Sequence, residues 1–202
     1  MKKRPYSLTW CDVRALDEAE ARRWLAEGGA MRRAEAEKMR WSARLAEAAG
    51  AARLLREAFG AACEREERDG RGKPRIPGAA AYSVSHSGGW VALAVAGEGV
   101  ERIGVDIEAR ALRRRALPEA LVRKTMDETE AAAVWASPDP WAEFLRRWVE
   151  KEAYVKATGE GVSGGLKDAM HRMASAEGWR VAPAEAPAGV FAAVAWEARG
   201  AE

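Results

Sequence analysis

The chain has 202 residues, enough for one large domain or for two small ones that each have a hydrophobic core. Hydrophobic residues make up 48% of it and the formal net charge is +2, a composition typical of globular proteins that argues against a dedicated DNA-binding protein. Two cysteines are too few for a disulfide framework, and no apolar run is long enough for a membrane span or a signal peptide. We therefore expect a cytoplasmic monomer that binds neither nucleic acid nor membranes.

The first part of the chain is predicted to mix strands and helices. Alternating residues predict a strand over residues 6–13, and Asp17 can cap a short helix that follows. Residues 31–59 are helical in composition, with a possible break at Gly50. Their many arginines are most simply a solvated face, although one of them, Arg44, is considered again below.

A loop and a hairpin follow. The loop Asp69-Gly-Arg71-Gly-Lys73-Pro74 could grip a phosphate group through its cations or could be an ordinary surface turn. Ser85-His86-Ser87-Gly88-Gly89 is predicted to form the tip of a hairpin between strands at residues 81–84 and 90–96. At such a tip, His86 could donate a hydrogen bond to a phosphate oxygen. A serine nucleophile activated by His86 is less favoured, because adjacent residues rarely point at each other.

The strand predicted over residues 100–108 carries two carboxylates. Its β-branched residues fall on one face, whereas Gly104, Asp106 and Glu108 share the other. Residues two apart on a strand lie roughly 6.6 Å apart, so both carboxylates can reach one hard cation. Taken alone, the pair is more simply the solvated face of an amphipathic strand.

Helices are predicted over residues 117–124 and 127–135 and then over a longer segment. Asp139 suits the N-cap of this long helix, Pro140 suits its first position, and Gly159 suits the residue just beyond its end. Residues 178–181 and 190–196 are predicted to close the fold as strands. His171 is expected to be a surface residue.

The long helix carries a carboxylate within its apolar stripe. At about 100° per residue, Glu152 falls between Trp148 and Val155 on the side that should face the core. Such a carboxylate needs a buried cation, a metal ion or a catalytic role. The alternative, an exposed pair with Lys156, would contribute only about 0.2–0.5 kcal/mol. Lys151 and Lys156 flank Glu152, which suggests that an anion lies between them.

These residues together indicate a site for phosphate chemistry. Asp106, Glu108 and Glu152 offer the oxygen ligands that Mg²⁺ or Mn²⁺ prefers. Nearby cations suit phosphate groups that such a metal would bridge; they are Lys73, His86, Lys151 and Lys156. The combination suggests transfer of a phosphorylated group. A different Mg²⁺-dependent phosphotransferase or nucleotidyltransferase is less favoured, because the sequence has no Walker-type loop or kinase signature.

Four ordered motifs resemble those of the 4′-phosphopantetheinyl transferases. Gly104-Val-Asp106-Ile-Glu108 is followed, after about forty residues, by Trp148-Val-Glu-Lys151-Glu152-Ala-Tyr-Val-Lys156-Ala-Thr-Gly159-Glu-Gly161. Gly72-Lys73-Pro74 and Val84-Ser85-His86-Ser87-Gly88 match two further stretches of that family. The length is similar to that of the surfactin-synthetase-activating class, whose single chain has two similar halves, and not to that of the shorter trimeric holo-carrier synthases.

The resemblance implies an α+β fold in which two similar α/β halves, a pseudo-duplication, enclose the active site. Residues 1–99 would form the N-terminal half, with the nucleotide contacts of coenzyme A. Residues 100–202 would form the C-terminal half, with the metal-binding carboxylates and the catalytic helix. The enzyme would transfer 4′-phosphopantetheine from coenzyme A to a serine of an apo acyl- or peptidyl-carrier protein, depend on Mg²⁺ and release 3′,5′-ADP. A non-catalytic coenzyme A- or carrier-binding module of the same fold is the alternative.

The resemblance also implies a role for each matching residue. Asp106, Glu108 and Glu152 would hold the metal ion on the pyrophosphate of coenzyme A. Glu152 would be the general base, Lys156 would stabilise or protonate the leaving phosphate, and Asp106 and His86 would complete the catalytic set. Coenzyme A would be bound by Arg44, Lys73, Ser85, His86, Asp106, Lys151, Glu152 and Lys156. An arginine run, Arg113-Arg-Arg115, could meet an acidic carrier helix or could be a solvated charge run.

Overall fold

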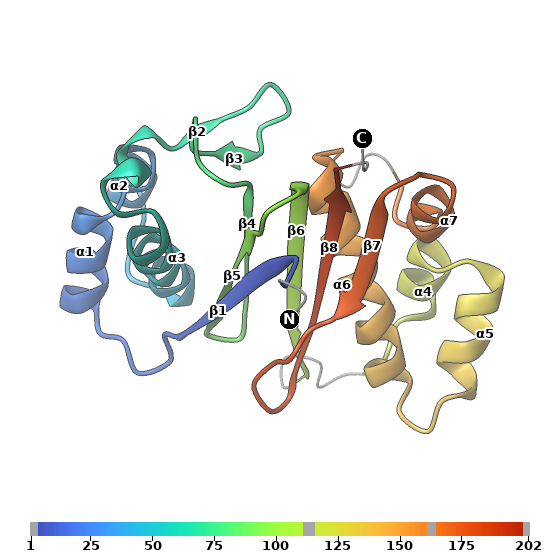
Figure 1. The fold of residues 1–202 in the computed structure, drawn as a ribbon. Helices are drawn as coiled ribbons and strands as arrows, with labels where there is room; N and C mark the ends of the chain where they lie inside the picture. The colour runs from blue at the N-terminus through green and yellow to red at the C-terminus, as the bar shows by residue number, and fades with distance from the viewer. Residues whose placement is uncertain (1–3, 111–115, 161–164, 200–202) are drawn as a thin grey trace.

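The computed structural model describes residues 4–110, 116–160 and 165–199. They form a mixed helix-and-strand structure in which two three-stranded antiparallel sheets lie in the middle of the molecule (Figure 1). Helices flank the sheets at both ends. Within the described part of the chain, no helix has the length and apolar character that crossing a membrane requires. The predicted mixture of helices and strands is therefore confirmed.

The first sheet belongs to the N-terminal part of the chain. It contains β1 (Tyr6–Asp12), β4 (Tyr82–Ser87) and β5 (Trp90–Ala96) in the order β1-β5-β4. Beside it lie α1 (Glu18–Glu27), α2 (Ala30–Glu37), α3 (Ala43–Phe59), the 3-10 helix η1 (Gly60–Arg65) and a small hairpin of β2 (Glu67–Arg68) and β3 (Pro74–Arg75). Leu45, Leu54 and Leu55 of α3 pack with Val91 and Leu93 of β5 in one buried core.

The helix predicted over residues 31–59 is interrupted, but not at Gly50. The break falls between α2 and α3, where the Ser42 hydroxyl caps α3 by accepting a hydrogen bond from the Leu45 N–H at 3.3 Å. Gly50 lies inside α3, and a Cβ there would lie 2.8 Å from Val13 and 2.9 Å from Val91. This glycine therefore lets α3 lie close against the sheet and does not end the helix.

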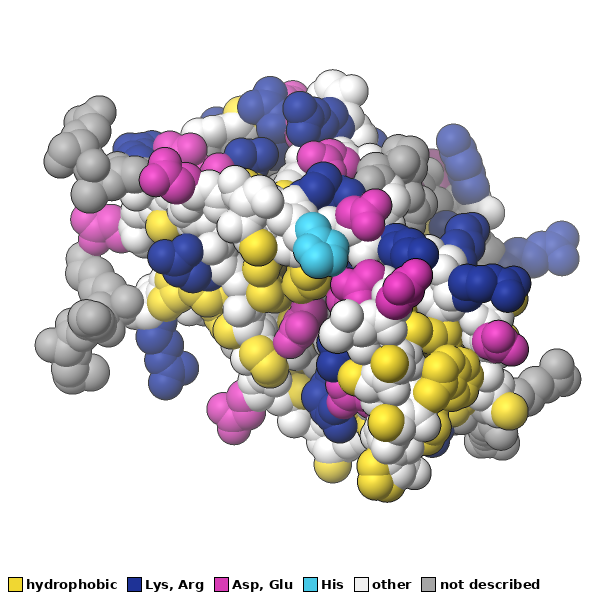
Figure 2. Space-filling model, turned by 90° about the vertical axis from the view of Figure 1, so that its right-hand side faces the viewer, with side chains coloured by type: hydrophobic (Ala, Val, Ile, Leu, Met, Phe, Trp, Pro, Cys, Tyr) yellow, Lys and Arg dark blue, Asp and Glu magenta, His cyan; other side chains and the backbone are white. Residues whose placement is uncertain are grey.

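The second sheet contains β6 (Val100–Ala109), β7 (Trp179–Pro183) and β8 (Val190–Ala198) in the order β6-β8-β7. Its helices are α4 (Glu119–Thr125), α5 (Glu128–Ala136), α6 (Pro140–Thr158) and α7 (Ala169–Ala174), the last of which the sequence did not predict. In each sheet, the strand that comes first in the sequence pairs with the strand that comes last. The strand that comes second in the sequence lies at an edge. The surface at this end of the molecule mixes acidic, basic and apolar side chains (Figure 2).

The predicted ends of the long helix are confirmed. Asp139 accepts a hydrogen bond from the Ala142 N–H at 3.1 Å, and Pro140 is the first helical residue. Gly159 ends the helix with φ +72°, a left-handed conformation that glycine adopts without steric cost. Local capping chemistry therefore fixes both ends of α6.

Two kinds of contact join the sheets. Ala92 and Ala94 of β5 lie in one buried core with Ile103, Val105 and Ile107 of β6. The second contact is the serine ladder, which we define as Ser83, Ser85 and Ser87 of β4. Their hydroxyl oxygens accept hydrogen bonds from the backbone N–H groups of Val105, Ile107 and Ala109, at 3.1, 3.2 and 3.0 Å. The hydroxyls thus satisfy buried donors that a neighbouring strand would otherwise satisfy with carbonyl groups.

Gly104 sets the distance between β6 and α6. A Cβ at this position would lie 2.0 Å from the carbonyl oxygen of Ala153 and 2.5 Å from the backbone nitrogen of Ala157. Both atoms belong to the helix backbone, so no side-chain rotation can relieve the overlap. The helix that carries Glu152 and Lys156 can approach the strand that carries Asp106 only because residue 104 has no side chain.

We predict that Gly104→Ala lowers the free energy of unfolding by about 1–3 kcal/mol, because α6 must move off the sheet. Urea denaturation followed by circular dichroism measures the change. Gly70→Ala is the matched control, because Gly70 is exposed and a Cβ there meets nothing within 4 Å; it should change stability by no more than about 0.5 kcal/mol. Equal stability of the two variants would contradict the close-approach explanation.

Candidate functional site

A pocket of about 320 Å³ lies between the two halves of the chain. The loop between β2 and β3, the start of β4 and the last turns of α6 contribute to its wall. Four cationic side chains line it, namely Arg32, Arg71, Lys73 and Lys156. Glu152 is the carboxylate that lines it among the described residues. Since the net charge of the whole chain is only +2, this positive character is local and suits an anionic ligand.

The serine ladder orients two of the predicted metal ligands. The Ser85 hydroxyl donates to Asp106 Oδ1 at 3.0 Å, and the Ser87 hydroxyl donates to Glu108 Oε2 at 3.0 Å. Asp106 is only 5% exposed. Its second oxygen, Oδ2, is buried and has no hydrogen-bond partner among the described residues. A buried carboxylate oxygen without a partner is costly unless a cation approaches it.

Glu152 approaches these carboxylates from α6. It is partly buried and makes no hydrogen bond or ion pair with the other residues that the structure describes. Burial raises the pKa of Glu152, the charge on Asp106 and that on Glu108 raise it further, and Lys156 opposes them. The structure therefore brings Asp106 and Glu108 near enough for their charges to act on Glu152.

The described residues nevertheless contain no group of three or more His, Cys, Asp or Glu side chains arranged to hold a metal ion. Lys156 lies at the carboxylates instead. Its Nζ donates to Asp106 Oδ1 at 2.6 Å and to the Ser85 hydroxyl at 2.9 Å. Its side chain is 33% exposed and also lines the pocket. Lys156 thus contacts Asp106 and lines the pocket at the same time.

The hydrogen bonds of Ser85 differ from those expected of a residue that binds coenzyme A. Its one hydroxyl hydrogen goes to Asp106, and its two lone pairs accept from the Ile107 N–H and from Lys156. A serine hydroxyl has one donor and two acceptor sites, so all are in use. In this arrangement Ser85 orients Asp106 and Lys156 and has no donor left for a phosphate.

Lys73 lies on the pocket wall, where backbone carbonyl groups hold its side chain. Its Nζ donates to the carbonyl oxygens of Ile103 and Ala157, at 2.9 and 3.0 Å. Arg71 donates to the carbonyl of Thr158 at 2.9 Å, so the loop places two cations at the C-terminal end of α6, where the helix dipole favours them. Burial lowers the pKa of Lys73 to about 8.

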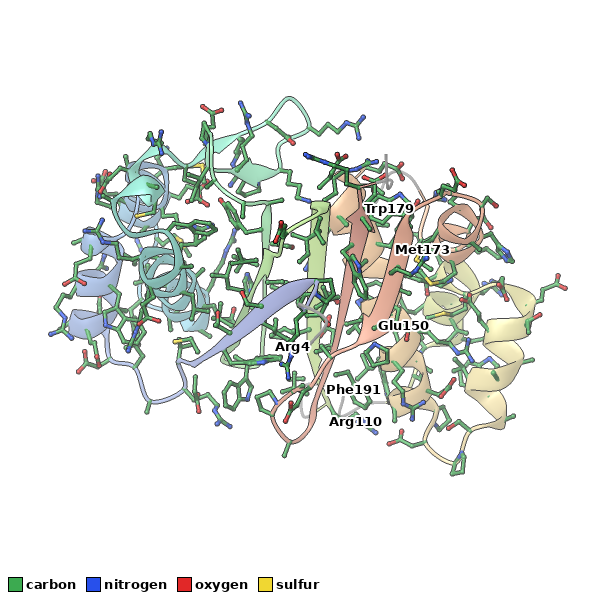
Figure 3. All side chains as sticks on the ribbon, in the orientation of Figure 1. Arg4, Arg110, Glu150, Met173, Trp179 and Phe191 are labelled. Atoms are coloured by element: carbon green, nitrogen blue, oxygen red, sulfur yellow. The ribbon has the colours of Figure 1, made fainter. Side chains whose placement is uncertain are left out.

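Lys151 does not lie in the pocket, which corrects the prediction that it binds coenzyme A. Its side chain is 1% exposed. Nζ donates to Glu130 Oε2 at 2.5 Å and to the carbonyl oxygens of Thr125 and Lys167, at 2.9 and 3.0 Å. The sequence did contain a signal for this. At about 100° per residue, Lys156 lies roughly 40° from Glu152 around the helix, whereas Lys151 lies about 100° away. Glu150, labelled in Figure 3, lies on α6 about 160° from Glu152 around the helix, so it points to a different side.

His86 and Arg44 are not among the residues that line the pocket. His86 belongs to strand β4 and not to the hairpin tip, which consists of Gly88 and Gly89. Its ring is half exposed, and Nδ1 lies 2.9 Å from Glu47 Oε2. Burial acts to raise the pKa of Glu47. Hydrogen bonds from His86 and Gly89 outweigh this effect and hold that pKa below its usual range. Arg44 is exposed on the first turn of α3.

Arg32 is the residue of the arginine-rich segment that reaches the pocket, and its role could not be read from the sequence. It donates two hydrogen bonds to Glu66, at 2.8 and 2.7 Å, and Glu66 also accepts one from the Tyr82 hydroxyl at 2.5 Å. No spacing rule links Arg32 to a partner more than thirty residues away. Arg113, Arg115 and Gly161, which the sequence analysis singled out, lie outside the described residues.

Two lysines of the same helix should differ in their effect on stability. We predict that Lys151→Met lowers the free energy of unfolding by about 3–5 kcal/mol, because it leaves Glu130 buried without its cation. Lys156→Met should cost less, because its side chain is partly exposed and Ser85 still donates to Asp106. Urea denaturation of both variants in one buffer tests this difference. Equal losses would show that burial does not distinguish the two ion pairs.

Comparison with known proteins relates the C-terminal half of the chain to one superfamily. Residues 102–194 match the family model of the 4′-phosphopantetheinyl transferase superfamily. An L-aminoadipate-semialdehyde dehydrogenase-phosphopantetheinyl transferase of Xenopus laevis is 31% identical over 114 residues, which are 50% of this chain and 37% of that protein. A 4′-phosphopantetheinyl transferase, psf-1, of Bacillus pumilus is 33% identical over 112 residues, 53% of this chain and 45% of that protein. The match thus spans less than half the length of either relative. The family model and both relatives support a relationship to the 4′-phosphopantetheinyl transferase superfamily. The segment that the family model matches contains Asp106, Glu108, Glu152 and Lys156.

Proposed function

We propose that this protein transfers the 4′-phosphopantetheine group from coenzyme A to a serine of an apo acyl- or peptidyl-carrier protein and releases 3′,5′-ADP. The observation that carries the proposal is the pocket that four cations and Glu152 line, with the charges of Asp106 and Glu108 acting on Glu152. These carboxylates lie within the segment that matches the transferase superfamily. Carriers of fatty-acid, polyketide and nonribosomal-peptide synthesis all remain candidate substrates.

The proposal includes the two-half, single-chain class of these enzymes. Residues 1–99 would then contact the nucleotide, and residues 100–202 would carry the metal ligands and the catalytic helix. The equal strand order of the two sheets supports this division, since each half has a first strand paired with its last. The pocket wall also draws residues from both sides of that boundary.

The proposal also includes Mg²⁺, or Mn²⁺, held by Asp106, Glu108 and Glu152. All three offer the oxygen ligands that these ions prefer. The unpartnered buried Oδ2 of Asp106 and the repulsion of Glu152 by Asp106 and Glu108 both fit a cation at this place. When bound, the ion would neutralise charge on the pyrophosphate of coenzyme A.

The chain's own residues would divide the chemistry as follows. Arg32, Arg71 and Lys73 would bind phosphate groups in the pocket. His86 and Arg44 do not line the pocket, so they would bind only a part of coenzyme A that extends beyond it. Glu152 would accept the proton of the carrier serine as its oxygen attacks the β-phosphorus. The bond from the β-phosphorus to the oxygen of 3′,5′-ADP would break, and Lys156 would stabilise or protonate that oxygen.

The transfer itself is tested by incubating the protein with Mg²⁺, coenzyme A and a panel of apo carriers. Intact mass measurement should show phosphopantetheine on at least one carrier. Asp106→Ala and Glu152→Gln should lower the rate by about 100-fold or more, because each removes a catalytic charge. Glu101→Gln is the control, because Glu101 is an exposed carboxylate of the same strand that pairs with Arg199; it should leave the rate unchanged.

Two results would count against this function. Coenzyme A binding by a folded protein that modifies none of the carriers would favour the non-catalytic binding module. Normal turnover by Asp106→Ala and Glu152→Gln would rule out the proposed metal site and base.

We predict that coenzyme A binds more weakly as the pH rises through about 8. The pKa of Lys73 is lowered to about 8, so its positive charge is lost from the free protein above that pH, and binding a phosphate then requires a proton to be taken up. Isothermal titration calorimetry between pH 7 and pH 9.5 measures the trend. Lys73→Arg should remove most of it, because arginine stays charged throughout this range. An equal pH dependence in Lys73→Arg would assign the trend to another group.

A further inference from the structure

We propose that Lys156 occupies the cation position of the carboxylate cluster as long as the pocket is empty, so that a divalent cation and a phosphate ligand bind cooperatively. The cluster is defined by Asp106, Glu108 and Glu152. This inference rests on the metal site of the proposed function, but it concerns a property of the chain itself: which cation the cluster holds before coenzyme A arrives.

The contacts of Lys156 place its ammonium group within the cluster. Nζ lies 2.6 Å from Asp106 Oδ1 and shares the Ser85 hydroxyl, which also donates to Asp106. Glu152 lies one turn earlier on the same helix face. A divalent cation bound to Asp106 would lie close to this ammonium group and would repel it, because the Asp106 side chain is only 7% exposed and the two charges would be poorly screened.

The cluster has room for a further cation charge. Lys156 contacts only the Oδ1 oxygen of Asp106, and Asp106 Oδ2 remains buried without a hydrogen-bond partner among the described residues. At the same time, no three metal-binding side chains in the described ranges are arranged to hold an ion. Both observations are expected if Lys156 partly neutralises the cluster and prevents its closure around a metal ion.

The side chain of Lys156 can also move from Asp106 into the pocket. Its side chain is one-third exposed, lines the pocket and has a flexible four-carbon stem. The other pocket cations are tied to different partners: Lys73 and Arg71 to backbone carbonyls, and Arg32 to Glu66. A phosphate group in the pocket would attract Lys156 away from Asp106 and leave the Ser85 hydroxyl as the donor to Oδ1. Because coupling between two ligands is reciprocal, a bound metal would strengthen phosphate binding by the same factor.

The test measures Mn²⁺ binding to the full chain by the electron paramagnetic resonance signal of free Mn²⁺, with and without coenzyme A. Binding of Mn²⁺ to coenzyme A alone is measured separately and subtracted. We expect coenzyme A to raise the Mn²⁺ affinity of the wild type by tenfold or more. Without coenzyme A, Lys156→Met should bind Mn²⁺ at least tenfold more tightly than the wild type, and its gain from coenzyme A should shrink.

Two control variants separate the effect of Lys156 from that of charge in general. Lys156→Arg keeps a cation beside Asp106 and should bind Mn²⁺ as weakly as the wild type. Lys124→Met removes an exposed lysine on α4, so it changes the net charge equally and should leave Mn²⁺ binding unchanged. Circular dichroism confirms that each variant is folded.

The inference is overturned if Lys156→Met binds Mn²⁺ no more tightly than the wild type, or if coenzyme A does not raise the wild-type affinity. The second measurement needs no variant, so it can overturn the inference even if Lys156→Met fails to fold. Tight binding that survives Asp106→Asn in the Lys156→Met background would place the metal elsewhere and would overturn both this inference and the proposed metal site. No transfer occurs in the assay, so a protein that modifies no carrier can still show the predicted coupling.

Discussion

Three serine hydroxyls on one strand connect the halves of this protein at the place where its carboxylates lie. Each accepts a hydrogen bond from the backbone of β6. The hydroxyls of Ser85 and Ser87 also donate hydrogen bonds to Asp106 and Glu108. The same three hydroxyl groups therefore set the alignment of β4 with β6 and the orientation of the two carboxylates. A slip of one residue would turn the ladder away from β6 and leave buried N–H groups unpaired, at about 1–3 kcal/mol each.

Helix α6 depends on contacts made at both of its sides. Gly104 lets it approach β6, whereas Lys151 ties it to Thr125, Glu130 and Lys167 on the other side. The positions of Glu152 and Lys156 relative to Asp106 follow from these contacts. Residues that touch no ligand thus determine whether the carboxylates and the cations face one another.

The cations of the pocket are held by neutral or acidic groups of the chain before any ligand binds. Lys73 and Arg71 lie against the last carbonyls of α6, Arg32 lies against Glu66, and Lys156 lies against Asp106. Backbone carbonyls fix a cation without neutralising it, so Lys73 and Arg71 keep their charge for an anion. The pairing of Lys156 with Asp106 is different, because it balances negative charge that a metal ion would otherwise balance. The coupling proposed for Lys156 follows from this difference.

The sequence by itself determined the features that depend on neighbouring residues. Asp139, Pro140 and Gly159 fixed the ends of α6 because caps act within a few residues, and alternation placed Asp106 and Glu108 on one face of β6. Only the tertiary structure decided the rest. It buried Lys151 against Glu130, used all the hydrogen-bonding capacity of Ser85, and brought Arg32 to the pocket in place of Arg44. It also moved the helix break away from Gly50. The carboxylate partners of Lys151, Ser85 and Arg32 lie 21 or more residues away in the chain, so no local periodicity specifies them.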